Sequence, residues 1–414
     1  MTNNREANHG KRREDRKKRR EQLLKSGKLS DQEKIILLNG EVQALQAQLR
    51  DQKAEEFTQT EIKEKVFKIS KNTLVLPNWL SRKSSPKSKM IPSIFASDWH
   101  YGEVVHGGEV GHVNEYNLEI ADKRIQNLVN NSLDILFNHL ANPKYDGLVF
   151  PLGGDMFSGD IHEELAKTNE LPMFPTALRL AGRLAWAIEV FADHFGRVHI
   201  PVVTGNHGRT TRKPSFKRRA YENFDWLLGC MLAARFKNDS RITFQISDGP
   251  DCRYSIYGHR YLLTHGDQFS GGGGIIGAIG PVLHGDSKKR TKESQKGSTY
   301  DTLICGHFHQ FSSSKKAIIN GSLKGFDEYA DQHNFAYEDP IQALWLTHPE
   351  RGALPPWSVF VDKVSDISKN KKVMPLKWEK KDGNEDFWDA PVTLKKMTHK
   401  IAKKTFKSKL KTKV

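Results

Sequence analysis

The stretch DTLICGHFHQF, residues 301–311, sets two histidines directly after a short apolar run and a glycine. The run from Leu303 to Cys305 is typical of a buried strand, and Gly306 lets the backbone turn sharply at its end. Side chains at positions i and i+2 of an extended segment point the same way, so we expect His307 and His309 to reach one small object together. Neutral imidazole is a preferred ligand of zinc, manganese and iron. An H-x-H pair can also be a packed or surface pair, so this stretch alone does not establish a metal site.

Four other apolar runs end in the same few kinds of polar residue. Ligands of open α/β sheets gather at the carboxyl ends of strands, where glycines allow the backbone to approach closely. Five strands that each deliver Asp, Asn or His to one edge are difficult to attribute to chance, so the joint pattern predicts a metal site. The further strand-end residues are Asp98 and His100, Asp155 after Gly153 and Gly154, Asn206 and His207 after Gly205, and His265.

The order of the apolar patterns predicts a mixed α/β fold. In the first half, strand-like runs alternate with segments of helical periodicity, which indicates βαβ units. The second half is typical of strand pairs, with turns at Asp248-Gly249 and Tyr257-Gly258. We therefore expect a sheet-on-sheet core flanked by helices. The expected strands cover 94–97, 148–152 and 198–204, the expected helices 114–140 and 175–196, and the expected strand pairs 242–264 and 342–362.

Composition limits the class of protein. A chain of 414 residues with 37% hydrophobic residues can hold one large domain with appendages, or two modest domains. It has no apolar run of about 18 residues and begins with a charged stretch, so we expect neither a membrane span nor a secretory signal. Cys230, Cys252 and Cys305 are scattered without a C-x-x-C motif. This usage favours a reducing, cytoplasmic setting over a disulfide frame or a zinc ribbon.

The positive charge is concentrated at the two ends of the chain. Residues 1–28 carry a net charge of +7 and residues 391–414 a net charge of +9, which together account for the +16 of the whole chain. We expect a basic, heptad-bearing helical extension at 1–60, a linker at 61–90, the main domain at 91–365 and a C-terminal extension with a basic tail at 366–414. The heptad positions are Ile35, Leu38, Val42, Leu45 and Leu49. A helix over 35–49 could dock on the main domain or form a homo-oligomer.

The five strand-end motifs resemble those of the calcineurin-like metallophosphoesterases. That family has D-x-H, G-D, G-N-H, a lone His and G-H-x-H in this order, and all five motifs are present between about residues 94 and 310. The resemblance implies a four-layer α/β/β/α sandwich over 91–365 and a dinuclear metal centre. One metal would be held by Asp98, His100, Asp155 and His309, and the second by Asp155, Asn206, His265 and His307, with Asp155 as the bridge.

The resemblance implies metal-dependent phosphoester hydrolysis. Two divalent ions about 3.5–4 Å apart clamp a phosphate and lower the pKa of a bound water. Mixed N/O ligation favours Mn²⁺, with Fe²⁺ or Zn²⁺ as alternatives, over Mg²⁺. His207 would face the substrate, and Gly208 replaces the acidic residue that often follows G-N-H. Arg209 could therefore hold a phosphate oxygen, and a carboxylate of Asp160, Glu163 or Glu164 could orient His207.

A basic run next to the third motif favours nucleic acid as the substrate. The residues concerned are Arg212, Lys213, Lys217, Arg218 and Arg219, and 209–219 contain no acidic residue. A second basic run lies at 284–296, although any such run can also be a solvated surface. We therefore expect a nuclease-like phosphodiesterase, distantly similar to Mre11/SbcD nucleases and phage-encoded, acting in the (host) cytoplasm. The alternatives are a phosphomonoesterase or nucleotide phosphatase, and a non-catalytic nucleic-acid-binding protein that keeps the fold.

Overall fold

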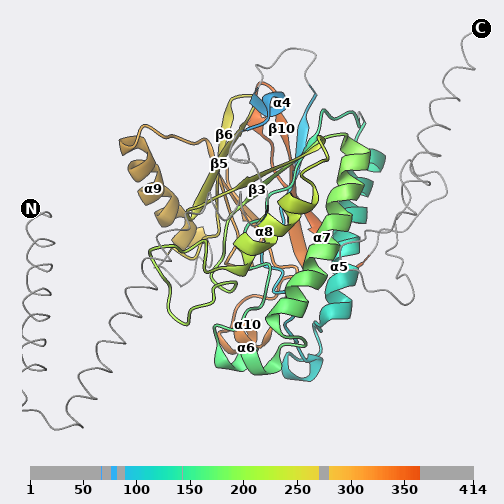
Figure 1. Cartoon of the computed structure of the whole chain (residues 1–414), viewed down its shortest axis with the longest axis vertical. Helices are drawn as coiled ribbons and strands as arrows, with labels where there is room; N and C mark the ends of the chain where they lie inside the picture. The colour runs from blue at the N-terminus through green and yellow to red at the C-terminus, as the bar shows by residue number, and fades with distance from the viewer. Residues whose placement is uncertain (1–66, 68–75, 82–88, 142, 270–278, 364–414) are drawn as a thin grey trace, which may run out of the picture. The chain divides into compact units, whose positions relative to one another are not determined.

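The computed structural model describes residues 67, 76–81, 89–141, 143–269 and 279–363 (Figure 1). The expected heptad segment at 35–49 and both basic ends lie outside these residues, so the predictions made for them stay predictions. Within the described part of the chain, no helix has the length and apolar character needed to cross a membrane.

The first sheet is built around four parallel strands. These are β1 to β4, and β10 lies antiparallel beside β1, with Ser93 of β1 opposite both Val149 and Trp345. Every residue of β1 and β3 is buried, including Ser93 and His199, since a parallel sheet is covered on both faces. The strand order is β11 (Gly352–Ala353), β10 (Ile341–His348), β1 (Ile91–Ile94), β2 (Leu148–Val149), β3 (Val198–Val202) and β4 (Ile242–Ile246), and β12 (Trp357–Phe360) also pairs with β10.

Three helices cover the outer face of this sheet: α5 (Leu118–Asp134), α7 (Met173–Phe195) and α8 (Phe224–Arg235) (Figure 1). The Asn117 side chain caps α5 by accepting a hydrogen bond from the N–H of Ile120 at 2.9 Å. A turn of π-helix, Ile135–His139, continues α5. Both helices expected from periodicity are confirmed, with slightly different ends.

The second sheet contains a hairpin and three parallel strands. β5 (Asp251–Ile256) and β6 (His259–Thr264) form the hairpin, and β6 continues in parallel to β7 (Thr302–Cys305) and then β9 (Ala317–Ile319). The short strand β8 (Ser312–Ser313) closes the edge. Helix α9 (Ile279–Gln295) lies on the outer face, and Val282 packs against Leu262 and Leu303 there.

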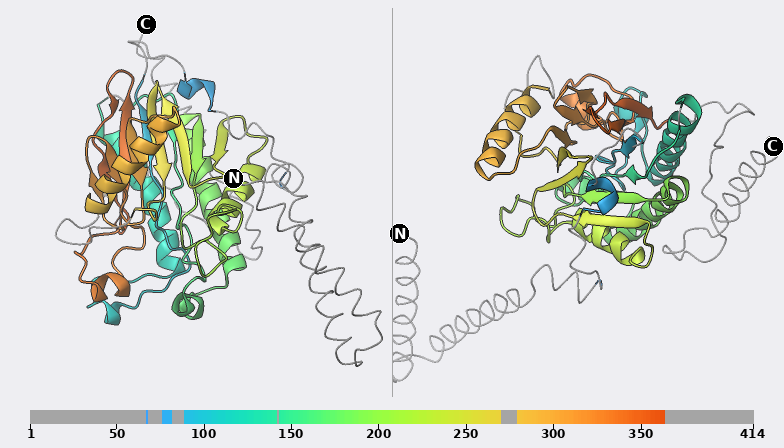
Figure 2. Two further views of the ribbon diagram at one scale, coloured as in Figure 1. Left: turned by 90° about the vertical axis from the view of Figure 1, so that its left-hand side faces the viewer. Right: turned by 90° about the horizontal axis from the view of Figure 1, so that it is seen from above.

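The main core lies between the two sheets. Along β6, Tyr261 and Leu263 face the first sheet, whereas Leu262 faces α9, as strand alternation requires. Phe95 and Trp345 complete the inner contact from the first sheet, with ring centroids 6.4 Å apart. The layers are therefore helices, sheet, sheet and helix, which Figure 2 shows from two further sides. The expected α/β/β/α sandwich is confirmed.

One part of the expected strand pairing is wrong. The segment 242–264 holds a single hairpin, closed at Tyr257-Gly258, because β4 pairs in parallel with β3 and belongs to the first sheet. The Asp248-Gly249 turn instead carries the chain from one sheet to the other. The remaining short elements are α4 (Asn78–Ser81), a 3-10 turn (Gly107–Glu109), α6 (Glu163–Thr168) and α10 (Glu328–Gln332).

Candidate metal centre

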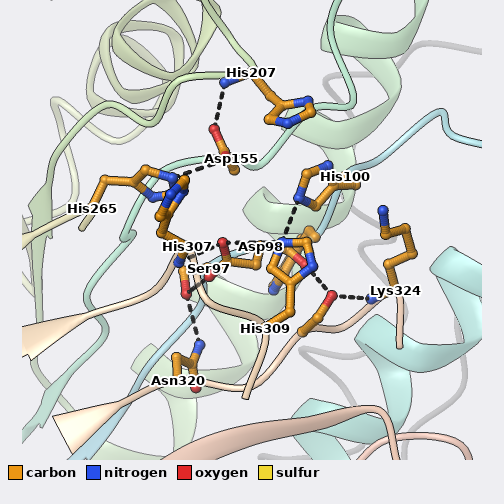
Figure 3. Close-up of polar contacts among 12 residues, drawn as sticks. Ser97, Asp98, His100, Asp155, His207, His265, His307, His309, Asn320 and Lys324 are labelled. Carbon is orange, nitrogen blue, oxygen red and sulfur yellow. Dashed lines mark hydrogen bonds and ion pairs between the residues drawn. The ribbon is translucent and has the colours of Figure 1, made fainter. Parts of the chain in front are cut away.

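The strand-end motifs of both sheets meet at one place (Figure 3). Side chains that follow β1, β2 and β3 come from the first sheet, and those that follow β6 and β7 come from the second. The ligand atoms form three overlapping groups, and the atoms within each group lie within 4.8 Å of one another. The groups are Asp98, His100 and His309; Asp155, His265 and His307; and His100, Asp155 and His207. Asn206 joins the second group, because its Oδ1 lies 3.1 Å from Nε2 of His265.

The first group converges through imidazole nitrogens and one carboxylate. Nε2 of His100 lies 3.0 Å from Nε2 of His309, and Nε2 of His309 lies 3.6 Å from Oδ1 of Asp98. The side chains of Asp98 and His100 are buried, and that of His309 is 29% exposed. Nitrogen lone pairs and a carboxylate that point at one another suit a borderline divalent ion.

The second group surrounds His265. Its Nδ1 lies 2.9 Å from the carbonyl oxygen of Gly153, which can only accept, so Nδ1 carries a proton. Its Nε2 faces Oδ2 of Asp155 at 2.9 Å. Nε2 is thus directed toward two oxygen atoms, those of Asp155 and Asn206, in the manner of a histidine whose other nitrogen is fixed by a backbone acceptor.

Asp155 belongs to two of the three groups and lies between their histidines. Figure 3 shows His265 and His307 on one side of it and His100 on the other. Its Oδ1 accepts a hydrogen bond from the N–H of His207 at 2.6 Å. The carboxylate therefore has a fixed orientation and faces both sides of the site, as a bridging ligand needs.

The backbone of the site is not extended, which corrects the expectation for His307 and His309. Their φ angles are 74° and 55°, and positive φ recurs at Asp98, His100 and Asp155. Such residues are rare outside glycine and indicate a constrained site. Because the segment turns, the two histidines do not reach one object: His307 joins Asp155 and His265, whereas His309 joins Asp98 and His100.

At two motif positions, glycine is required because there is no room for a side chain, and not because of the φ angle. A Cβ on Gly205 would overlap Oδ1 of Asp155, and a Cβ on Gly306 would overlap Oδ2 of Asp98. Both glycines lie where a strand end of one segment packs against the carboxylate of another. A side chain at either position would displace a candidate ligand.

The charges at the site favour a cation between the two sheets. Burial raises the pKa of Asp98 to about 6 and lowers that of His307 to about 4, so His307 is a neutral imidazole at pH 7. Burial alone would lower the pKa of His265, but contact with Asp155 raises it to about 10. Without metal, a proton on His265 therefore supplies the positive charge that Asp155 and Asn206 attract. A divalent ion fits the same set of donors.

His207 is oriented by a backbone carbonyl, a partner that the sequence interpretation did not consider beside the possible carboxylates. Its Nδ1 lies 2.8 Å from the carbonyl oxygen of Ser158. Asp160, Glu163 and Glu164 are exposed at the start of α6, and Glu163 pairs with Lys167. Burial lowers the pKa of His207 to about 4, so the ring is neutral with its proton on Nδ1.

Arg209 is bound to the backbone of its own loop. Its guanidinium donates to the carbonyl oxygens of Thr211, Asn206 and Arg212 at 2.8, 3.0 and 3.0 Å. Three of its five N–H groups are therefore used within the loop, and one N–H on each terminal nitrogen is left for a phosphate. Arg209 thus also positions the backbone of Asn206.

The two basic runs differ in exposure. Arg212, Lys213, Lys217 and Arg218 are exposed, and Arg219 pairs with Asp267 at 2.8 Å. In the second run, Lys289 is buried against Asp251, Arg290 pairs with Asp286, and Lys292 lies near Glu293. The run at 284–296, expected to add positive surface, is thus largely neutralised by its own neighbours.

The sequence interpretation missed a buried ion pair behind His100. Oε1 of Glu103 accepts a hydrogen bond from Nζ of Lys324 at 2.8 Å, and its Oε2 lies 3.3 Å from Nδ1 of His100. Lys324 also pairs with Asp327, and all three residues are buried. Although burial opposes the charge on Glu103, Lys324 holds the pKa of that carboxyl well below its usual range.

Asp225 was missed as well. Its carboxylate accepts hydrogen bonds from the N–H groups of Asp155, Gly205 and Met156 at 3.1, 2.9 and 3.2 Å. It lies in the first turn of α8, whose N-cap is Asn223. The sequence NFDW, 223–226, is a recognisable helix start, and that was the only signal available.

No protein-family model matches the sequence, and no curated protein does. Solved structures of similar fold include a conserved uncharacterized protein of Streptococcus pneumoniae, described as a predicted phosphoesterase (12% identity, TM-score 0.25, covering 65% of this chain and 98% of that one). Others are a Vps29 single mutant from Entamoeba histolytica (13%, 0.24, 62% and 85%) and Vacuolar Protein Sorting 29 from Cryptosporidium parvum (12%, 0.25, 62% and 85%). At these identities and TM-scores, the similarities carry no argument about this chain.

Proposed function

We propose that the chain is a metal-dependent phosphoester hydrolase, because its two-sheet sandwich brings the strand-end motifs of both sheets to one site, and these motifs resemble those of calcineurin-like metallophosphoesterases. The observation that carries this proposal is the position of Asp155. Its buried carboxylate lies between two groups of histidines and is the shared member that a dinuclear centre requires. A merely structural polar cluster would not need two buried histidines, His100 and His265, on opposite sides of this carboxylate.

The donor sets indicate which residues would hold each ion. Asp98, His100 and His309 would hold one ion, and Asn206, His265 and His307 the other, with Asp155 between them. Two such ions would neutralise a phosphate and lower the pKa of a bound water. Mixed nitrogen and oxygen donors favour Mn²⁺, with Fe²⁺ or Zn²⁺ as alternatives.

His207 is the side chain that could supply a proton during the reaction. The Ser158 carbonyl fixes the ring, and the ring lies beside His100 with centroids 4.5 Å apart. A bound anionic phosphate would favour the protonated ring, since an opposite charge raises the pKa of an imidazole. His207 could then hold the proton that a leaving oxygen needs.

We further propose that the substrate is nucleic acid. The exposed cations of the loop 209–219 follow His207 directly in the chain, and a row of cations suits a backbone of repeated phosphates.

Hydrolysis assays with purified full-length chain test the proposal. With Mn²⁺, we expect cleavage of a bis-aryl phosphate and of DNA or RNA, and D155N should lower the rate by a factor of about 10³ or more. D160N, which alters an exposed carboxylate nearby, should retain the activity. Hydrolysis of a mono-aryl phosphate alone would favour a phosphomonoesterase. Equal activity of D155N and the unmodified chain on every substrate would contradict the metal-dependent mechanism.

A further inference from the structure

The Phe216 side chain is fully exposed, with 101% relative exposure, and is the most exposed of the large hydrophobic residues in the described part of the chain. We propose that Phe216 stacks on an unpaired base, so that the loop 209–219 selects single-stranded nucleic acid for the metal centre. This inference rests on the proposed nuclease function and narrows its substrate class. Burying a phenylalanine ring would stabilise the chain by about 1.5–3 kcal/mol, so a ring held wholly in water gains by finding a partner.

The loop holds Phe216 outward through its own hydrogen bonds. Arg209 donates to three carbonyl oxygens within 206–212, and the N–H of Thr210 donates to the carbonyl of Glu222 at 2.9 Å. Next to the ring, the Ser215 hydroxyl donates to the carbonyl of Lys217 at 2.5 Å. Arg219 anchors the far end on Asp267. A loop that is fixed in this way loses little conformational freedom when a base stacks on the ring.

The charges around Phe216 are complementary to a nucleic-acid strand. Lys217 and Arg218 follow the ring directly, and Arg212 and Lys213 precede it, all of them exposed. Cations that follow a phosphate backbone, combined with an exposed aromatic ring, are the features of proteins that bind single strands. A duplex offers the phosphates but keeps its bases stacked inside, so the ring would gain little from it.

The position of the loop connects this ring to the candidate metal centre. Asn206, a candidate ligand, lines one small cavity together with Thr211, Ser215 and Asp267. Ser215 is the neighbour of Phe216, so a strand in contact with the ring lies within reach of the same surface as Asn206. Bases on the loop side and a phosphate at the metals can then belong to one strand.

An exposed phenylalanine among cations can also insert into an anionic membrane surface. We favour nucleic acid because the loop is tied to a candidate metal ligand through the bond from Arg209 to the carbonyl of Asn206. A phospholipid surface also carries phosphoesters, but it offers no unpaired base on which the ring could stack. Binding to vesicles is therefore included as an outcome of the test.

The test compares binding of F216A, F216W and the unmodified full-length chain in Mn²⁺ to phosphorothioate oligonucleotides, measured by fluorescence anisotropy. We expect F216A to bind a single strand about tenfold more weakly, since stacking contributes about 1–3 kcal/mol per base, and F216W to bind as well as the unmodified chain. The same strand without bases, and a duplex of equal length, should bind F216A and the unmodified chain equally. F360A, which removes an exposed ring on β12, should change nothing.

Three outcomes would overturn the stacking proposal. These are equal binding of the single strand by F216A and the unmodified chain, an equal loss on the strand without bases, and a loss seen only with phosphatidylserine-containing vesicles. Hydrolysis of the bis-aryl phosphate separates this inference from the proposed function. F216A should hydrolyse that small substrate normally. Failure of the unmodified chain to hydrolyse it would contradict the proposed function, whereas the oligonucleotide binding of F216A would still test the stacking.

Discussion

The two basic runs of the main domain are both rich in Lys and Arg, but their cations lie in different environments. The loop 209–219 carries four exposed cations beside the candidate metal centre: Arg212, Lys213, Lys217 and Arg218. The run at 284–296 forms most of α9, where Lys289 is buried and Arg290 and Lys292 lie beside acidic residues. A run of cations in a sequence therefore does not by itself predict a basic surface, because its charges can be neutralised within the fold. Four cations of the first run are exposed, whereas three of the second lie beside acidic residues.

The largest effect on stability is expected at Lys289. Its ammonium group is 4% exposed and binds Asp251 and the side chain of Gln268, the latter at 3.1 Å. K289M leaves the buried Asp251 without its main partner, so we expect the free energy of unfolding to fall by about 3–5 kcal/mol. Urea denaturation of K289M and of K288M, at an exposed position, measures this. Equal stability of the two variants would show that the second run is a surface after all.

Behind the metal centre, the buried pair of Glu103 and Lys324 should matter for metal binding rather than for charge at the surface. E103Q keeps the shape but weakens the hold on Nδ1 of His100, from which Glu103 lies 3.3 Å away. We expect Mn²⁺ affinity to fall by about 10–100-fold, as with other residues that orient metal-binding histidines. Calorimetric titration measures the affinity, with E109Q at an exposed glutamate as the control. Unchanged affinity in E103Q would mean that the pair serves only the packing.

Charge-reversal variants compare directly how much each of the two basic runs contributes to nucleic-acid binding. The double variant R212E/K213E should weaken binding to a single-stranded oligonucleotide on the order of tenfold at 0.1 M salt and make it less dependent on salt. The matched variant K288E/K296E changes two exposed cations of the second run and should have a small effect. Salt titrations of both variants provide the comparison. A larger loss from the second variant would reverse the assignment of the nucleic-acid surface.

Much of the fold and of the candidate site could be predicted from the sequence. Alternation of strand and helix periods gave the layers, and five short motifs identified the residues that meet at the strand ends. The pairing of β4 with β3 could not be predicted, because a strand does not indicate in its own sequence which sheet it will join.

The supporting contacts were beyond the sequence for a physical reason. Asp225 and Lys324 act through partners distant in the chain, Asp155 and Glu103, and neither has a local pattern that shows burial. The group that orients His207 is a backbone carbonyl, which every residue has, so no residue type could indicate it. The expectation for His307 and His309 was wrong because it assumed extended backbone where φ is positive.

The proposed mechanism requires that Asp155 is shared by two metal ions. Calorimetric titration of the metal-free full-length chain with Mn²⁺, checked by elemental analysis, measures the number of ions bound. We expect two ions per chain, and loss of at least one of them in D155N, whose amide is a poor bridge between two cations. A single ion in the unmodified chain, or two ions held equally well by D155N, would contradict that mechanism.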